Sequence, residues 1–480
     1  MLKRLDLLFC LLILILLSRL FSMAVLPMSG TSEARYSEIA RIMAETGDWI
    51  TPWFDYGLPF WGKPPLSFWL EALSFRVFGV TEFAARLPSW LVSLGVLALI
   101  YYLTRVIAGH RQAMIAALIF SSMALSFMMS GAVLTDPFLA LGTTLSLVSI
   151  ILAVRRPASK WCWWFFVGLA IGLLAKGPLA LVLVGGPLVL WLLWRGHWRD
   201  VYQCIPWSRG LLLTAIIALP WYILAELKTP GFINYFIVGE HFLRFIDPGW
   251  SGDLYGTAHK QAYGTIWLYW VWATFPWGPI IVIAVSLRYF SSKITNPKLN
   301  DEQSLLFICV LFPSLFFTFS GNILWTYQLP ALIPLAILIA VSIDNSVPAT
   351  NFGKVSGITV IVFVPLVVML IGFYGYFYPE KFKTEKTLVE YYDKHKLSTT
   401  PALIYINKAP FSARFYSKGN VTSKSLSEVQ ALADNKTAYY LAVPSKNIDT
   451  IIPSLSGQVA IATTNKKFSL LKISPKQRQR

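Results

Sequence analysis

Long apolar runs recur along this chain, and they constrain its fold more than any other feature. About 20 consecutive apolar residues are enough to cross the hydrocarbon core of a bilayer. Candidate spans of roughly this length are 6–27, 86–107, 112–130, 133–154, 161–176, 178–195, 209–227, 263–288, 303–320, 326–343 and 355–378. With 56% hydrophobic residues, the sequence predicts an α-helical integral membrane protein. We expect about 11–13 transmembrane helices.

The basic residues indicate how these spans are oriented. The formal net charge is +17, and most Lys and Arg lie in short connections between the apolar runs. Such connections face the cytoplasm under the positive-inside rule and attract anionic membrane lipid, so we do not assign the charge to nucleic-acid binding. The loops 28–85 and 228–262 and the C-terminal region then lie on the outer side, which in a bacterium is the periplasm.

The composition changes to that of a soluble protein after residue 378. Short runs rich in β-branched and aromatic residues predict strands, and a polar stretch between them predicts a helix. The predicted strands are 402–406, 438–443, 459–463 and 468–473, and the predicted helix is 425–434. The sequence therefore predicts a transmembrane domain over 1–378 and a small periplasmic α/β domain over 379–480, with a disordered tail at 476–480.

The first outer loop carries an unusual concentration of acids. Its acidic residues are Glu33, Glu38, Glu45, Asp48, Asp55 and Glu71, in a chain of only 14% charged residues. Apolar residues at helical spacing from Tyr36 to Met43 predict one amphipathic helix, and a second is predicted from Pro64-Pro65 to Gly79. We call residues 30–79 the roof, because two interfacial helices joined by an aromatic loop would cover a site at the membrane boundary.

The motifs of several soluble enzyme classes are missing from the sequence. It contains no glycine-rich phosphate loop after a strand, no HExxH, no GxSxG and no CxxC pair, and its four cysteines are isolated. This argues against a nucleotide-sugar enzyme with a Rossmann fold, a zinc protease and a serine hydrolase. The remaining candidates are ionisable residues at the outer ends of the apolar runs, where a charge is costly and therefore marks a site.

Four motifs in and after the roof resemble a known family. They are SEARYSEIARIM (32–43), GDW (47–49), GKPPL (62–66) and FGVTEFAARLPS (78–89). Together they resemble the first periplasmic loop of the GT-C-fold glycosyltransferases that use polyprenyl-phosphate sugars. The most similar branch is that of the bacterial lipid A aminoarabinose transferases, distant relatives of protein O-mannosyltransferases. The resemblance covers about residues 28–340 and implies the GT-C fold.

The resemblance implies a site for the phosphate of the lipid-linked donor. Lys63 matches the family lysine that contacts this phosphate, and Lys176-Gly177 resembles a family Lys-Gly pair. Arg244 lies in a stretch that resembles a family loop, and a guanidinium suits bidentate phosphate binding. The full set expected at the phosphate or lipid is Arg35, Lys63, Arg86, Lys176, Arg244 and Tyr327. The alternative is that these residues only snorkel to lipid headgroups or anchor the interface.

Two acids and three further residues complete the expected site. Glu33 follows Ser32, which stands where the family commonly has a first acid, so Glu33 is one catalytic candidate. Asp136, in Thr135-Asp136-Pro137, resembles the second acidic motif of the family and is the other candidate. The further candidates are His241, His259 and Tyr36. The alternatives are that Glu33 caps its helix and that the histidines are structural.

Metal dependence is left open by the sequence. The family often has Glu immediately before the motif lysine, where the Glu can help to hold a metal ion. Gly62 occupies that position here, so we assign no metal ligand and name no cofactor.

The resemblance implies transfer of a sugar from polyprenyl phosphate to lipid A, with inversion, at the bacterial inner membrane. The expected sugar is 4-amino-4-deoxy-L-arabinose or another pentose or aminosugar, and the expected enzyme is a monomer. The same donor chemistry also serves protein O-mannosylation and other surface glycans. A lipid flippase or transporter and a non-catalytic scaffold are the alternatives from other classes. A transporter is disfavoured because no internal repeat is visible and the polar residues gather at one face.

Overall fold

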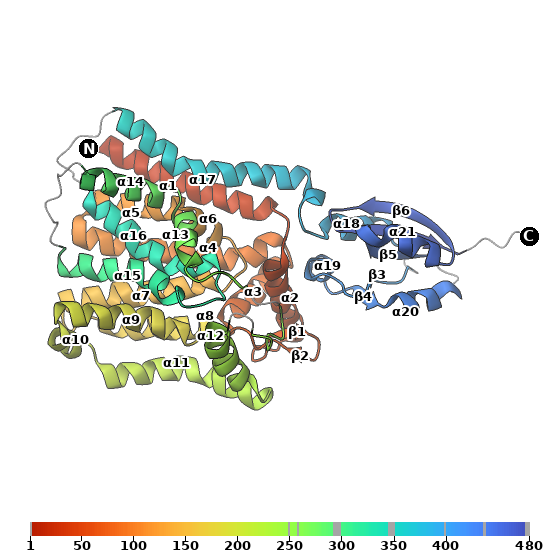
Figure 1. Cartoon of the computed structure of the whole chain (residues 1–480), viewed down its shortest axis with the longest axis horizontal. Helices are drawn as coiled ribbons and strands as arrows, with labels where there is room; N and C mark the ends of the chain where they lie inside the picture. The colour runs from red at the N-terminus through yellow and green to blue at the C-terminus, as the bar shows by residue number, and fades with distance from the viewer. Residues whose placement is uncertain are drawn as a thin grey trace, which may run out of the picture.

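The computed structural model describes residues 2–247, 250–256, 259–290, 299–343, 351–397, 400–434 and 438–475. A helical bundle makes up most of the molecule, and a smaller part that contains a sheet lies beyond α2 at one end of the bundle (Figure 1). The tail 476–480, for which disorder is predicted, lies outside the described residues.

Six helices of the described chain are long and apolar enough to cross a membrane. They belong to α1 (Leu2–Val25), α4 (Glu82–Ala108), α7 (Asp136–Arg155), α11 (Trp207–Lys228), α16 (Leu329–Ser342) with the preceding turn η2 (Trp325–Gln328), and α17 (Asn351–Phe377). A seventh span results if α13 (Thr265–Thr274) and α14 (Trp277–Phe290), which are bent by 103°, are counted as one. The chain is thus a multi-pass membrane protein.

The other expected spans are present as shorter helices. They are α5 (His110–Ser122), α6 (Ala124–Met129), α8 (Trp161–Lys176), α9 (Leu179–Arg195) and α15 (Asp301–Phe317). At 1.5 Å per residue, the 16 residues of α8 extend about 24 Å, less than the hydrocarbon core. Gly177 ends α8 with a left-handed φ of 74°, and Pro178 follows it. The described residues therefore hold six or seven spans of full length, and α8, α9 and α15 follow the runs predicted for them but have 17 residues or fewer. Two predicted runs are divided: 112–130 into α5 and α6, and 263–288 into α13 and α14.

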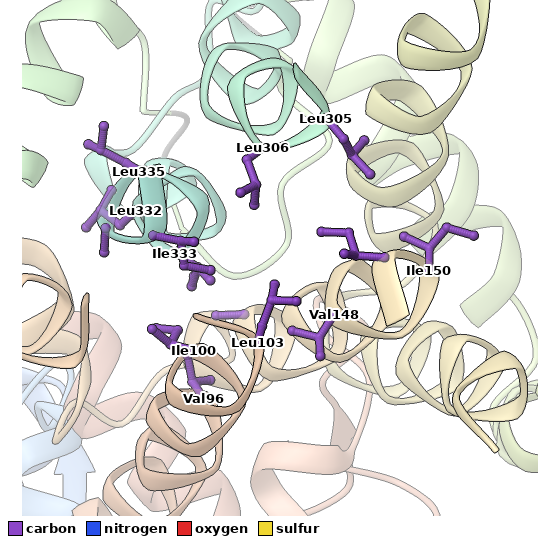
Figure 2. Close-up of a cluster of buried hydrophobic side chains, with 14 of the residues drawn as sticks. Val96, Ile100, Leu103, Val148, Ile150, Leu305, Leu306, Leu332, Ile333 and Leu335 are labelled. Carbon is purple, nitrogen blue, oxygen red and sulfur yellow. The ribbon is translucent and has the colours of Figure 1, made fainter. Parts of the chain in front are cut away.

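Helix α7 forms the centre of the bundle, because 89% of its apolar membrane-spanning stretch is buried inside the protein. Figure 2 shows ten side chains of this core, which come from α4, α7, α15 and α16: Val96, Ile100, Leu103, Val148, Ile150, Leu305, Leu306, Leu332, Ile333 and Leu335. A continuous apolar core of this kind holds the outer ends of these helices in fixed relative positions.

Glycines bring α7 and α8 into backbone contact. A Cβ atom on Gly142 would lie 2.7 Å from the carbonyl oxygen of Gly168, and one on Gly168 would lie 2.7 Å from that of Gly142. Small residues permit such close approach of membrane helices. The contact determines how the start of α7 lies relative to the end of α8, where two candidate site residues are located.

The roof has the two predicted helices. They are α2 (Thr31–Thr46) and α3 (Leu66–Phe78), joined through the short strands β1 (Trp53–Asp55) and β2 (Leu58–Pro59). The apolar face of α2 is buried as expected. However, Glu38 and Arg41 are buried as well, and their side chains pair at 2.8 Å. The sequence did not indicate this burial, because the cover over Arg41 comes from Gly419, far away in the chain.

The C-terminal part contains a five-stranded sheet of order β4-β3-β5-β7-β6. Its strands are β3 (Leu403–Ile406), β4 (Val421–Lys424), β5 (Tyr439–Pro444), β6 (Gln458–Thr464) and β7 (Phe468–Ser474). Strand β3 is parallel to β4 and β5, whereas β7 is antiparallel to β5 and β6. The four expected strands are present, but β4 was not predicted, because its polar sequence VTSK lacks a strand pattern.

Short helices complete the described chain. They are α10 (Trp198–Cys204), the π-helix η1 (Asn234–Leu243), α12 (Arg244–Ile246), η3 (Pro379–Lys381), α18 (Lys386–His395), α19 (Phe411–Tyr416), α20 (Leu426–Gln430), η4 (Ala431–Asp434), η5 (Ser445–Asn447), α21 (Ile448–Ile451) and η6 (Ile452–Ser454).

The C-terminal part rests on the roof through α19. Phe415 packs against Phe75 of α3 with 6.1 Å between ring centroids, and Arg414 forms an ion pair with Asp55 at 2.6 Å. Beside this contact, Lys386 and the hydroxyl of Tyr416 both reach Glu82 at the start of α4. The roof is therefore held between the bundle and the C-terminal sheet.

Candidate functional site beneath the roof

The first element of the site is an ion pair between two helix ends. Asp136 begins α7 and Lys176 ends α8, and the Lys176 Nζ atom lies 2.6 Å from Asp136 Oδ1. Both side chains are buried. An acid at a helix N-terminus and a base at a helix C-terminus both interact favourably with the helix dipoles. The ammonium group of Lys176 also lies 4.7 Å from the centroid of the Tyr327 ring.

The second element is a carboxylate between two cations. Lys63 Nζ lies 3.1 Å from Glu240 Oε2, and Arg244 Nη1 lies 2.8 Å from Glu240 Oε1. Arg244 Nη1 also lies 3.4 Å from Asp253 Oδ2. Burial by itself would raise the pKa of Glu240, but Lys63 and Arg244 outweigh this effect and lower the pKa to about 2. Glu240 is thus a carboxylate at any physiological pH.

These two elements form one site. Lys63 lies close enough to Tyr36, Arg244 and Tyr327 to interact with them electrostatically, and Tyr327 interacts in the same way with Asp136. The phosphate-site candidates Arg244, Lys176 and Tyr327 thus gather around Lys63 of the roof, although the four residues come from four separate stretches of the chain.

Arg35 and His259 lie at the edge of this group. The Arg35 guanidinium donates to the carbonyl oxygen of Tyr255 and lies 5.4 Å from the ring centroid of Tyr36. His259 is exposed, and partial desolvation together with the positive charge of Arg244 lowers the pKa of its imidazole. His259 is therefore mainly neutral near pH 7.

His241 contacts two backbone carbonyl oxygens beside the group of cations. Its Nδ1 atom lies 2.7 Å from the carbonyl oxygen of Phe236, and its Nε2 atom lies 3.0 Å from that of Lys176. Desolvation lowers the pKa of this buried imidazole, so one of its nitrogens donates and the ring is neutral. His241 therefore lies between η1 and the end of α8 and donates a hydrogen bond to one of these two carbonyl oxygens.

Glu33 and Arg86 form a separate cluster. Both oxygens of Glu33 lie 2.9 Å from the guanidinium of Arg86, which also donates to the carbonyl oxygens of Met23, Leu26 and Pro27. Glu33 Oε1 is 3.4 Å from the backbone nitrogen of Val133, in the loop that leads to Asp136. The structure thus places these two candidates together, joining α1, α2 and α4, and not beside Lys63.

Two functional candidates were missed by sequence reasoning. Glu240 stands one helical turn before Arg244, a spacing that favours an ion pair and was the available signal. Glu71 of α3 is fully buried, and neither of its carboxylate oxygens has a hydrogen-bond partner among the described residues. Burial, and then the charge of Glu33, raise the pKa of Glu71 well above its usual value. No sequence signal marked this residue.

The described residues contain no group of three His, Cys, Asp or Glu side chains placed to hold a metal ion. An apolar pocket does lie deeper in the bundle, between α7, α9, α15 and α16. Its lining includes Thr143, Leu183, Leu305, Pro330 and Ile333.

Comparisons of the sequence with known proteins point to one group. A family model described as dolichyl-phosphate-mannose-protein mannosyltransferase matches residues 6–236. An undecaprenyl phosphate-alpha-4-amino-4-deoxy-L-arabinose arabinosyl transferase of Proteus mirabilis is 32% identical over 320 residues, which cover 64% of this chain and 54% of that protein. One from Sodalis glossinidius is 30% identical over 318 residues, with 64% and 53% covered. The chain thus spans about half the length of these curated relatives.

Solved structures share the fold over nearly the whole chain. The crystal structure of ArnT from Cupriavidus metallidurans bound to undecaprenyl phosphate matches with a TM-score of 0.75 at 16% identity, and the match covers 97% of both chains. The same protein in the apo state matches with a TM-score of 0.73. The chain therefore has the GT-C fold and is similar in sequence to the undecaprenyl-phosphate-aminoarabinose arabinosyl transferases.

Proposed function

We propose that the protein is a bacterial inner-membrane glycosyltransferase that moves a sugar from polyprenyl phosphate to lipid A on the periplasmic side. The gathering of Lys176, Arg244 and Tyr327 around Lys63 of the roof carries this proposal. Cations at the outer ends of membrane helices suit an anionic lipid headgroup. The names of the relatives support undecaprenyl phosphate as the carrier and 4-amino-4-deoxy-L-arabinose, or another aminosugar or pentose, as the sugar.

In the proposed reaction the bond between the anomeric carbon and the phosphate oxygen breaks, and polyprenyl phosphate leaves. Negative charge grows on that oxygen as the bond breaks. Lys63 and Arg244 would stabilise this charge, and they would do so more strongly in the transition state than in the bound donor. Both side chains are held in place by Glu240 before the donor arrives, so little reorganisation is needed.

The acceptor would attack the anomeric carbon from the opposite face in a single displacement with inversion. A phosphate of lipid A is already anionic near neutral pH and needs no strong base. Asp136 contacts Lys176 and begins α7 at the site, so we assign it the acceptor side. If the acceptor is a hydroxyl, Asp136 would accept its proton. Glu33 would act indirectly, through Arg86 and the loop that leads to Asp136.

The lipid tail and the orientation complete the proposal. The polyprenyl tail of the donor would lie between the membrane-spanning helices. The roof and the C-terminal sheet domain would face the periplasm, where nucleotide sugars are absent and a lipid carrier supplies the activated bond. The enzyme would act as a monomer.

The test is transfer of labelled sugar from undecaprenyl phosphate in membranes that contain the wild type or Lys63→Ala. Loss of one group that stabilises transition-state charge costs about 100-fold in rate, so we expect that loss for Lys63→Ala. Lys228→Ala is the matched control, because Lys228 also pairs with the roof, through Asp48, but lies outside the site. Near-normal transfer by Lys63→Ala would remove Lys63 from the donor site. Label on protein instead of lipid A would reassign the acceptor.

A further inference from the structure

Glu240 occupies the position between the two cations that the proposed donor phosphate would contact. Each of its carboxylate oxygens faces one cation, Lys63 at 3.1 Å and Arg244 at 2.8 Å. The hydroxyl of Tyr235 is 3.4 Å from Oε1. Only 5% of the Glu240 side chain is exposed, so bulk water does not screen its charge.

The position of Glu240 is fixed by its surroundings. It belongs to the π-helix η1, a helix type that often occurs at functional sites. The preceding residue, Gly239, packs so closely against Trp250 that a Cβ atom would lie 2.9 Å from the indole ring. Further charged or titratable groups that interact with Glu240 are Tyr255, Tyr327 and His241. The carboxylate is therefore a built part of the phosphate site.

The charges of the site sum to a small positive value. Lys63, Arg244 and Arg35 contribute three positive charges, and Glu240 and Asp253 contribute two negative charges. The Lys176–Asp136 pair is neutral overall, and His259 is mainly neutral because its pKa is lowered. The net charge of this group is thus +1, and it would be +2 without Glu240.

A net charge of +1 matches the substrate better than the product. A sugar joined to polyprenyl phosphate is a phosphodiester and carries one negative charge. When the sugar leaves, the carrier becomes a phosphomonoester whose second proton dissociates with a pKa near 6, so it carries close to two negative charges at pH 7. A second negative charge beside a buried carboxylate is disfavoured by like-charge repulsion.

We propose that Glu240 is a specificity-determining residue that matches the phosphate site to the singly charged donor and weakens its hold on the doubly charged product. This inference rests on the proposed function. Glu240 neutralises one of the two cations and so limits the attraction of the site for a dianion. Its role is to favour release of polyprenyl phosphate after each transfer.

The experiment measures binding of two lipids to the full chain in nanodiscs at pH 5 and pH 8. The probes are undecaprenyl phosphate, whose charge changes over this range, and its methyl ester, which stays a monoanion. Glu240→Gln keeps the side-chain shape and removes the charge. We expect it to bind undecaprenyl phosphate at least about tenfold more tightly than the wild type at pH 8. The gain should be much smaller at pH 5, and smaller for the methyl ester at both pH values.

The control is Glu226→Gln, which removes a negative charge near the end of α11, where Glu226 accepts hydrogen bonds from the backbone nitrogens of Gly231 and Ile233. It should leave both affinities unchanged. If Glu240→Gln raised the affinity for both lipids equally, Glu240 would only compete with any phosphate for Lys63 and Arg244. That result would overturn the proposed charge matching. Weaker binding of both would show a structural role and also overturn it.

A second measurement needs no variant. The affinity of the wild type for undecaprenyl phosphate should not increase between pH 5 and pH 8, and a clear increase would contradict the inference. The proposed function fails separately, if the wild type binds neither lipid or if Lys63→Ala binds both as well as the wild type does.

Discussion

Lys176 Nζ and Asp136 Oδ1 lie 2.6 Å apart, although 40 residues separate them in the chain. The pair joins the end of α8 to the start of α7 at the point where glycine contacts bring the two helices together. It thus combines a structural role in the bundle with a position at the proposed donor site.

Breaking this pair should cost stability as well as activity. Lys176→Met leaves Asp136 buried without its partner. Asp136→Asn likewise leaves Lys176 buried without its partner. Each should lower the free energy of unfolding by about 3–5 kcal/mol. The double variant with Asp136→Leu and Lys176→Met should regain most of this stability but not sugar transfer. Thermal unfolding and transfer assays check both parts. Full activity of the double variant would show that Asp136 and Lys176 take no part in sugar transfer.

Glu33 and Arg86 give the second prediction. Both carboxylate oxygens of Glu33 bind Arg86. Glu33→Gln should therefore lower the unfolding temperature but leave most of the transfer rate intact. Arg86→Lys should behave in the same way, since an ammonium cannot reproduce the bidentate contact. An unchanged unfolding temperature with abolished turnover in Glu33→Gln would instead place this carboxylate on the substrate.

Phe415 gives a prediction on the contact between the C-terminal sheet domain and the roof. Its ring is buried against Phe75, and truncating a buried phenylalanine costs about 3–5 kcal/mol. Phe415→Ala should speed hydrogen exchange in α2 and α3 and lower transfer, because the roof is less firmly held. Ile461→Ala, at an exposed position of the sheet, is the control. Unchanged exchange in the roof would mean that the C-terminal domain does not hold it.

Glu385 gives a prediction on pH. Its carboxylate accepts from Asn465 Nδ2 at 3.0 Å and from the Tyr405 hydroxyl at 3.3 Å, and burial raises its pKa from 4.5 to about 7. Between these values the folded state binds a proton that the unfolded state does not. The contribution of Glu385 to the free energy of unfolding of the C-terminal domain is therefore largest below pH 4.5. This contribution, about 3 kcal/mol, is lost as the pH rises through 7.

Glu385→Gln should remove this dependence. Calorimetry of the full chain at several pH values between 4.5 and 8 measures it, with Glu428→Gln as the control, because Glu428 is exposed. A wild-type transition that shifts no more than that of Glu385→Gln would contradict the raised pKa.

The sequence by itself determined the features that depend on local pattern. Apolar runs identified a membrane protein, and helical spacing with Pro64-Pro65 and Gly79 identified the roof helices. Short runs rich in β-branched and aromatic residues identified four of the five strands. The motifs around Lys63 and Arg86 identified the family resemblance. Each of these signals lies within about 20 residues, where backbone preferences and periodicity act directly.

Only the tertiary structure decided which candidates meet. Lys63 pairs with Glu240, 177 residues away, and Arg86 pairs with Glu33, 53 residues away, so one arginine of the expected phosphate set lies in a different cluster. The break at Met123 that ends α5 and the burial of Glu38 and Arg41 were equally hidden. The physical reason is that the partner of a buried charge depends on which helix ends pack together, and that depends on the whole core.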